Sequence, residues 1–134
     1  MNRTALLAAG DTAVFAVFTT VGLFSHNDGF TVGHFARNFI PLTLCWFLVS
    51  FITETYTSGG PIRVGINWLL GVTAGIIVRK WWVGSPDGRQ FWTFLAVALI
   101  TNGVFLLIWR GIASRIAPRP AASVAGAARE GETV

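Results

Sequence analysis

Long apolar stretches separated by short polar or glycine-rich segments make up most of the chain. Four of these stretches approach the roughly 20 residues that an α-helix needs to cross the hydrocarbon core of a bilayer. They run over about 5–24, 38–56, 62–83 and 91–110, with turn-forming segments such as TSGGP and GSPDG between them. The pattern predicts an all-α integral membrane bundle of four transmembrane helices.

The second and third stretches depend on their flanking residues to reach spanning length. We expect Pro41 in the first turn of the second helix, where a missing amide donor costs little, and Tyr56 as an anchor at the interface. The uncharged part of the third stretch is only fifteen residues long. Arg79 can extend its side chain toward the headgroups, and Trp81 and Trp82 suit the interface, which extends this span to about residue 83.

The amino-acid composition indicates that the chain folds in a membrane and not in water. Apolar residues make up 53% and charged residues 12%, whereas soluble domains contain roughly 25% charged residues. The ten basic residues give a net charge of +4, but they are scattered and mostly flank the apolar stretches. We therefore expect the lipid bilayer as the partner and no nucleic acid.

Domain organisation and topology follow from the four spans. We expect a transmembrane domain over 1–112 and a flexible cytoplasmic tail over 113–134, whose Ala/Pro/Gly/Arg/Glu composition has no apolar period. Asp11 and the length of the first stretch argue against a cleaved signal peptide. Basic residues number six on the side of the termini (Arg3, Arg63, Arg110, Arg115, Arg119, Arg129) and four on the other (Arg37, Arg79, Lys80, Arg89). We expect a cytoplasmic (inner) membrane, and this bias favours both termini in the cytoplasm.

Asp11 is the most informative polar residue in the apolar stretches. A carboxylate about two turns inside a span costs several kcal/mol unless it is paired, neutralised or hydrated, so it should face other helices. Ranking residues by depth places three polar residues in the same half of the bilayer, Ser50, Asn67 and Asn102, and three charged residues at its edge, Glu54, Arg63 and Arg110. This intramembrane polar cluster, with Arg63 or Arg110 as the counter-ion, is either a small-ligand or proton site or a hydrogen-bond network that fixes helix register.

Gly71 and Gly75 form a G-x-x-x-G pair in the third stretch. Small residues at this spacing let two helix backbones approach closely. The pattern predicts helix packing, and it leaves open whether the second helix belongs to the same chain or to another copy.

The opposite side of the membrane offers weaker candidates. Arg37 and Arg79 should lie at similar height, where they would hold an anionic headgroup or substrate or serve as interfacial anchors. The spacing of His26, Asp28 and His34 matches no strong metal site, so no metal and no cofactor are expected. Catalytic sequence motifs are absent, and the single cysteine, Cys45, reads as a packed thiol.

The order of these features resembles a known family. An Asp early in the first span (Asp11), an Arg opening the second (Arg37), the segment from Gly71 to Arg79, and a fourth span ending in Trp109–Arg110 are similar to the prokaryotic membrane family catalogued as domain of unknown function 3054. The resemblance covers about 5–110. It implies the four-span layout, and it brings no agreed activity or catalytic residue.

Three functional hypotheses follow from the sequence. The leading one is a non-enzymatic small carrier or channel-like subunit centred on Asp11. Because four helices rarely enclose a translocation route, this hypothesis needs an oligomer, for which Gly71 and Gly75 would supply a packing face. The alternative is an accessory or assembly subunit of a larger membrane complex, and a membrane-embedded enzyme using the loop from His26 to Arg37 is the least favoured.

Overall fold

The computed structural model describes residues 2–25 and 29–117. This part of the chain forms four α-helices and no strand: α1 (Arg3–Ser25), α2 (Val32–Ile52), α3 (Pro61–Val83) and α4 (Gly88–Ile116). The predicted all-α fold with four long apolar helices is confirmed.

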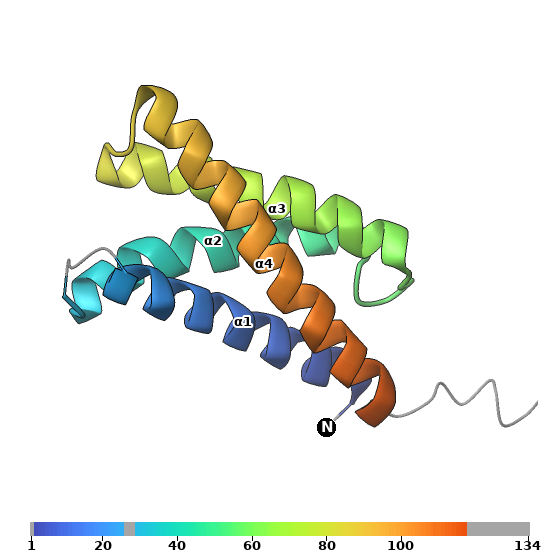
Figure 1. Cartoon of the computed structure of the whole chain (residues 1–134). Helices are drawn as coiled ribbons and strands as arrows, with labels where there is room; N and C mark the ends of the chain where they lie inside the picture. The colour runs from blue at the N-terminus through green and yellow to red at the C-terminus, as the bar shows by residue number, and fades with distance from the viewer. Residues whose placement is uncertain (1, 26–28, 118–134) are drawn as a thin grey trace, which may run out of the picture.

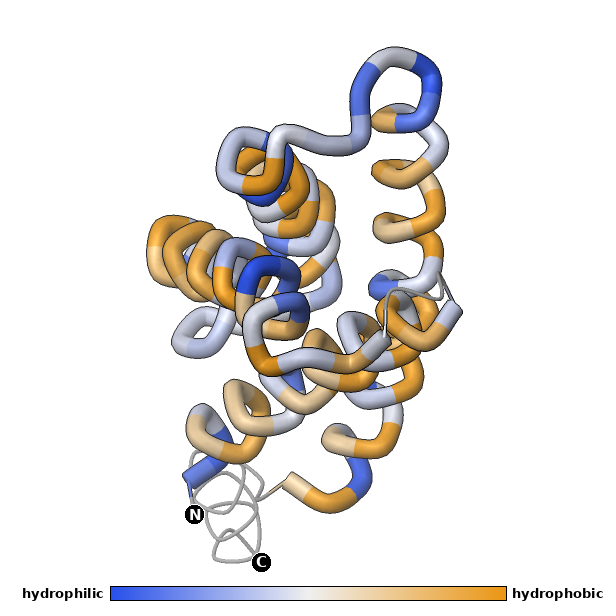
Figure 2. The backbone as a smooth tube through the Cα atoms, turned by 90° about the vertical axis from the view of Figure 1, so that its left-hand side faces the viewer, coloured by the Kyte–Doolittle hydropathy of each residue, from blue (hydrophilic) through white to orange (hydrophobic). Residues whose placement is uncertain are grey.

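The outer surface of the bundle is apolar. Each helix is long and apolar enough to cross a membrane, and at most 33% of its most apolar stretch is buried within the protein. Figure 2 shows hydrophobic residues along the helices and hydrophilic residues mainly at the helix ends and connections. Soluble monomers rarely expose continuous apolar surface of this extent. The chain is therefore a membrane protein with four spanning helices.

The helices form a ring in which each one contacts two others. The contacting pairs are α1–α2, α2–α3, α3–α4 and α1–α4, and the most extensive contact is between α2 and α3. Figure 1 shows α4 crossing the other helices obliquely, with the N-terminus, the α2–α3 connection and the end of α4 at one end of the bundle. We call this the terminal end, and the α1–α2 and α3–α4 connections lie at the opposite end.

Glycines at the crossing points bring α2 and α3 together. A Cβ atom at Gly75 would lie 2.7 Å from the Leu42 Cα, and one at Gly71 would lie 3.2 Å from the Trp46 Cα. These glycines therefore pack against α2 of the same chain, which answers the question that the sequence leaves open. They are not available as the packing face of an oligomer, so that expectation is wrong.

At the two crossings of α4, a glycine of one helix packs against a tryptophan side chain of the other helix. A Cβ atom at Gly10 of α1 would overlap the indole of Trp109, at 1.9 Å from its Cε2. At the α3–α4 crossing, a Cβ atom at Gly103 would lie 3.1 Å from the Trp68 Nε1. Each flat indole covers a position without a side chain, which lets the helices approach although the tryptophan is large.

Helix α2 begins earlier than predicted. It starts at Val32 because the Thr31 side chain accepts a hydrogen bond from the backbone N–H of His34 at 3.1 Å and caps the helix. Pro41 consequently lies inside α2 and is buried, so its predicted place in the first turn is wrong. Membrane helices tolerate an internal proline where neighbouring helices surround it.

Two helix ends also differ from the predicted spans. Helix α2 ends at Ile52, and Glu54 just beyond it has a left-handed backbone conformation with φ 51° that an α-helix does not allow. Helix α4 continues to Ile116, since Ala113 is still buried against the bundle. The predicted tail over 113–134 thus begins within helix, and its residues from 118 on lie outside the described part of the chain.

Gly75→Ala is expected to destabilise the protein. The new Cβ would meet the α2 backbone at Leu42, and the resulting displacement should lower the free energy of unfolding by about 1–3 kcal/mol. Unfolding by SDS in mixed micelles, followed by circular dichroism, measures this. Gly22→Ala is the matched control, because nothing lies within 4 Å of a Cβ there, and it should gain up to ~1 kcal/mol of helix propensity. Equal gains in both variants would contradict the α2–α3 packing.

Candidate functional site

Asp11 forms an ion pair with Arg110 inside the bundle. The Asp11 side chain in α1 is fully buried, and its Oδ2 accepts a hydrogen bond from the Arg110 Nη2 of α4 at 2.6 Å. The Arg110 side chain keeps 17% of its surface exposed. Of the two counter-ions that the sequence offers, the fold therefore places Arg110 against Asp11, and the pair joins α1 to α4.

Two further residues complete the surroundings of this carboxylate. The Tyr56 hydroxyl donates a hydrogen bond to the same Asp11 Oδ2 at 2.6 Å, and it accepts one from the Trp46 Nε1 at 2.8 Å. Trp46 is fully buried in α2, and Tyr56 lies in the connection that follows α2. We call Asp11, Arg110, Tyr56 and Trp46 the charged centre.

The hydropathy pattern places neither Tyr56 nor Trp46 in the polar cluster. Tyr56 directly follows an apolar stretch, a position typical of interfacial anchors, and Trp46 lies within that stretch. Glu54 has a left-handed backbone conformation in the turn after α2, and Tyr56, two residues later, hydrogen-bonds Trp46 and Asp11. A turn of this kind leaves no clear signal in the hydropathy pattern.

The protonation state of Tyr56 suits its role as a donor. Burial, and then the negative charge of Asp11, raise the pKa of its phenol above the ordinary value. The hydroxyl therefore stays protonated at neutral pH. The Arg110 guanidinium carbon also lies 5.5 Å from the centre of the Tyr56 ring, within reach of a cation–π interaction.

Two polar atoms of the ion pair form no hydrogen bond with the described residues. The Asp11 Oδ1 and the Arg110 Nε are both buried and have no hydrogen-bond partner within the described part of the chain. Buried polar atoms without partners are uncommon in folded proteins. The charged centre thus keeps hydrogen-bonding capacity beyond what its own four residues use.

The other predicted members of the polar cluster form separate contacts. The Asn67 Nδ2 donates to the Ser50 Oγ at 2.5 Å and links α3 to α2. The Asn102 Nδ2 donates to the Ala98 carbonyl of its own helix at 2.8 Å. All three predicted side chains are buried. They hold helices or their own backbone, and within residues 2–25 and 29–117 no direct hydrogen bond joins them to Asp11.

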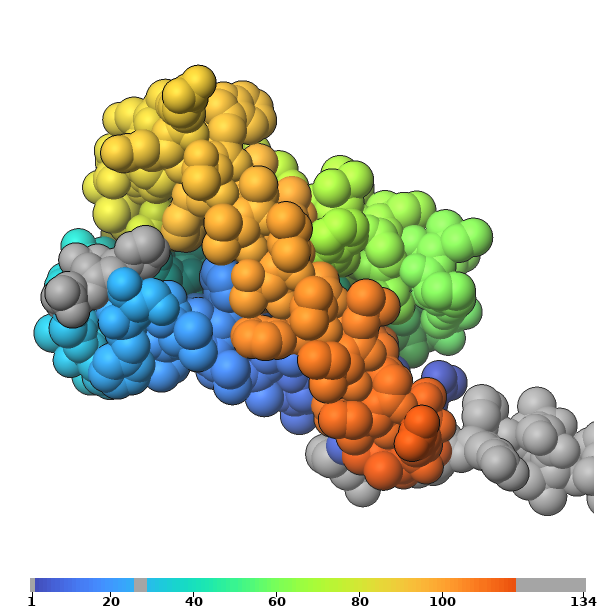
Figure 3. All heavy atoms as spheres, viewed as in Figure 1, coloured from blue at the N-terminus to red at the C-terminus, as the bar shows by residue number. Residues whose placement is uncertain are grey.

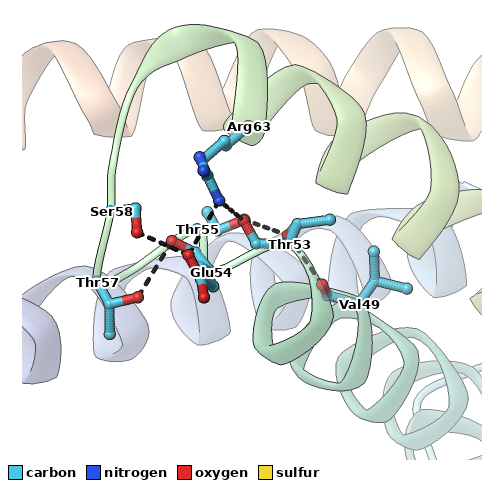
Figure 4. A network of polar contacts seen from close by, with 7 residues as sticks. All are labelled: Val49, Thr53, Glu54, Thr55, Thr57, Ser58 and Arg63. Carbon is cyan, nitrogen blue, oxygen red and sulfur yellow. Dashed lines mark hydrogen bonds and ion pairs between the residues drawn. The ribbon is translucent and has the colours of Figure 1, made fainter.

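Glu54 and Arg63 pair with each other at the turn between α2 and α3. The Arg63 Nη1 lies 3.3 Å from the Glu54 Oε2 and donates to the Thr53 carbonyl at 2.8 Å, while Ser58 donates to the same carboxylate at 2.8 Å (Figure 4). Both charged side chains are exposed, so the ion pair adds little stability. Arg63 closes this turn, and Arg110 takes the place beside Asp11.

A cleft of about 690 Å³ opens beside the charged centre. It lies between α3 and α4 toward the terminal end, with Arg3 and Leu7 of α1 also on its wall, and Figure 3 shows the hollow beside the C-terminal half of α4. Arg110 lines this cleft as well as binding Asp11. The buried ion pair is therefore reached from one side.

The basic residues predicted at the opposite end take part in local contacts. Arg79 hydrogen-bonds Asn38 of α2 through its Nε, donates to the Ser85 carbonyl at 2.9 Å, and stacks on the Phe94 ring at 4.8 Å. Arg37 is adjacent to Asn38 in the chain, and its Nε donates to the Gly33 carbonyl at 3.4 Å. The fold thus brings Arg79 to the start of α2 near Arg37.

Two of the three residues that were compared with metal ligands lie outside the described part of the chain. These are His26 and Asp28, and His34 lies in the first turn of α2. Over the described ranges, no group of three or more His, Cys, Asp or Glu side chains is placed to hold a metal ion.

Substitutions at Asp11 should separate the charge from the hydrogen bonds. Asp11→Asn keeps an acceptor for Tyr56 and should lower the free energy of unfolding by about 1–3 kcal/mol. Asp11→Leu removes the hydrogen-bond acceptor as well as the negative charge, and it should cost about 3–5 kcal/mol. Unfolding by SDS, followed by circular dichroism, measures both. The double variant Asp11→Leu/Arg110→Met should recover most of the loss, and equal stability of the Asn and Leu variants would contradict the buried pair.

Tyr56 is the chain's only tyrosine. The absorbance of tyrosinate, followed as the pH is raised, therefore reports the ionisation of this residue alone. In the folded protein this signal should appear only well above the ordinary pKa of roughly 10. Because the folded-state pKa is raised, the stability that the Tyr56 hydrogen bond supplies should persist below the ordinary pKa and be lost as pH rises through the folded value. Asp11→Asn should move the titration downward by removing the neighbouring charge, and Tyr56→Phe should abolish the signal. Ionisation at the ordinary pKa in the folded protein would mean that the hydroxyl faces water.

Comparison with known proteins identifies the family without adding an activity. No curated protein and no solved structure matches the chain. A family model described as "Protein of unknown function (DUF3054)" matches residues 8–113, which include α2, α3, most of α1 and α4, and both members of the ion pair. The chain belongs to this family of unknown function.

Proposed function

We propose that this membrane protein is a small carrier-type subunit whose working part is the Asp11–Arg110 ion pair and the adjoining cleft. The observation that carries the proposal is the double position of Arg110, which binds a fully buried carboxylate at 2.6 Å and also lines the cleft. Ionisable residues inside membrane spans are costly and commonly mark substrate or ion pathways. Packing alone would be served as well by apolar residues of similar volume.

An anionic group entering the cleft would compete with Asp11 for Arg110. A guanidinium group offers five N–H donors. Among the residues that the structure describes, the only hydrogen bond that Arg110 donates is the one from its Nη2 to Asp11. The ion pair is also a direct link between α1 and α4. An exchange of partners at Arg110 would therefore weaken the contact between these two helices, which couples anion binding to helix movement.

The same proposal includes an oligomer in a prokaryotic cytoplasmic membrane, with both termini in the cytoplasm. The bias of basic residues toward the terminal side supports this orientation. Four helices give little room for a complete route, so neighbouring copies would complete it. Because Gly71 and Gly75 pack within the chain, the contact between copies would use other outward faces.

The alternative function is an assembly subunit of a larger membrane complex. Large aromatic side chains near the α3–α4 connection favour it, since Trp81 is 87% and Trp92 68% exposed. Tryptophans at this height also suit the membrane interface. In the assembly role the charged centre would be static, whereas in the carrier role the cleft must open to both sides of the membrane.

Cysteine labelling separates the two roles without knowledge of the substrate. Cys45 is the only cysteine, so Cys45→Ser supplies the background for Val104→Cys in the cleft wall. A membrane-impermeant maleimide should label Val104→Cys from the cytoplasmic side and, for the fraction of molecules in the other state, from the opposite side. Right-side-out and inverted vesicles give the two rates.

Val97→Cys is the matched control on the same helix. Val97 and Val104 are similarly exposed, at 54% and 49%, but only Val104 lines the cleft. Val97→Cys should react from neither side because it faces lipid. Labelling of Val104→Cys from a single side would favour the assembly role and overturn the carrier proposal.

A further inference from the structure

We infer that the cleft between α3 and α4 binds a single-chain anionic amphiphile, with its acidic head at Arg110 and Arg3 and its alkyl chain between the two helices. A long-chain carboxylate is the simplest such molecule. Only the identification of this amphiphile as the transported substrate rests on the proposed carrier role. Binding itself is argued from the charge, shape and size of the cleft.

The head of the ligand should be anionic because the lining charges are positive. Arg3 and Arg110 are the two charged residues on the cleft wall, and no acidic side chain of the described chain lines it. Gly60 and Pro61 also line it, at the point where α3 begins without a side-chain cap. The free N–H groups and the positive dipole end of that first turn add to the attraction for an anion.

The rest of the wall is apolar and held in place. Trp68 donates its indole N–H to the Leu99 carbonyl at 2.9 Å and lies against Gly103, which fixes this wall across the α3–α4 crossing. Val64 and Val104 continue the apolar surface on the two helices. A preformed apolar slot with a few polar groups at one end is the usual form of a small-molecule site.

The volume of the cleft fits one chain better than two. It measures about 690 Å³, within the range of roughly 300–1,000 Å³ for small-molecule sites. At roughly 30 Å³ per heavy atom, the share of a water molecule in the liquid, it holds ~20 heavy atoms. That is the size of one long-chain carboxylic acid, and a two-chain phospholipid is more than twice as large.

The direction of the cleft matches the way an amphiphile lies in a membrane. Arg3, Gly60 and Ser114 are at the terminal end of the helices, whereas Trp68 and Ile100 are deeper in α3 and α4. A ligand with its head at the terminal end and its chain toward the bilayer centre would enter sideways from that leaflet.

Photolabelling in vesicles tests the inference directly. The full chain is reconstituted in phosphatidylcholine vesicles with hexadecanoic acid that carries a diazirine in its chain. After irradiation, crosslinked peptides should map to the first half of α3 and the second half of α4. Unlabelled hexadecanoate should compete, and hexadecanol, which has the same chain without the charge, should need at least about tenfold more.

A pair of glycine variants provides the matched structural control. Gly65 lines the cleft, and nothing lies within 4 Å of a Cβ there, so the side chain of Gly65→Leu should fill the cleft without disturbing the packing. Its labelling should fall at least about tenfold. Gly22→Leu makes the same change on α1, also in open space and away from the cleft, and should label like the wild type. Arg3→Gln should weaken competition by hexadecanoate and leave that by hexadecanol unchanged.

Three results would overturn the inference. These are equal competition by hexadecanol and hexadecanoate, unchanged labelling of Gly65→Leu, and competition by two-chain phosphatidylglycerol as strong as that by hexadecanoate. Each is independent of the cysteine experiment. Failed photolabelling with two-sided cysteine labelling would leave a carrier of another substrate, and specific photolabelling with one-sided cysteine labelling would leave a binding protein that does not carry its ligand.

Discussion

The burial of one carboxylate in a medium without water constrains much of this fold. Asp11 lies well inside α1, where an unpaired charge would cost several kcal/mol. Its Oδ2 is satisfied by Arg110 from α4 and by Tyr56, which is itself held by Trp46 from α2. These partners come from segments that are far apart in the sequence. The charge on α1 can therefore be buried only if α2, the turn after it and α4 are all in place.

Packing between the helices follows from a second constraint, the absence of a hydrophobic driving force in lipid. Helices in a membrane must gain contact by close approach, which small residues allow. The glycines at positions 71, 75, 10 and 103 serve this purpose, and for three of these four glycines the facing residue is a tryptophan. The fourth glycine, Gly75, meets the backbone of α2 at Leu42. The backbones of α2 and α3 are thus in contact, whereas α4 meets its neighbours through indole rings.

The sequence predicts the helices well because the membrane requires long apolar stretches. It also singles out Asp11, since the cost of a buried charge does not depend on the fold. Depth along a helix does not specify which way a side chain points around it, so it cannot choose between Arg63 and Arg110. Arg63 lies across a short turn from Glu54 and pairs locally, which only the backbone path reveals. Tyr56 escapes prediction for the same reason, because a left-handed residue at Glu54 reverses the chain just before it.

These two kinds of contact divide the bundle into parts that differ in how they can change. In the α2–α3 contact the two backbones touch directly, so the helices cannot shift relative to each other without losing the contact. The α1–α4 contact includes a charge pair at the wall of a cleft, and a charge pair can exchange one partner for another of the same sign. A neutral ligand would leave Asp11 and Arg110 bound to each other. Only an anion can replace Asp11 at Arg110, and it can do so fully only if Asp11 gains a proton or another cation, because a bare carboxylate would otherwise remain buried. In the proposed carrier, the occupancy of the cleft would therefore depend on the charge state of the first helix.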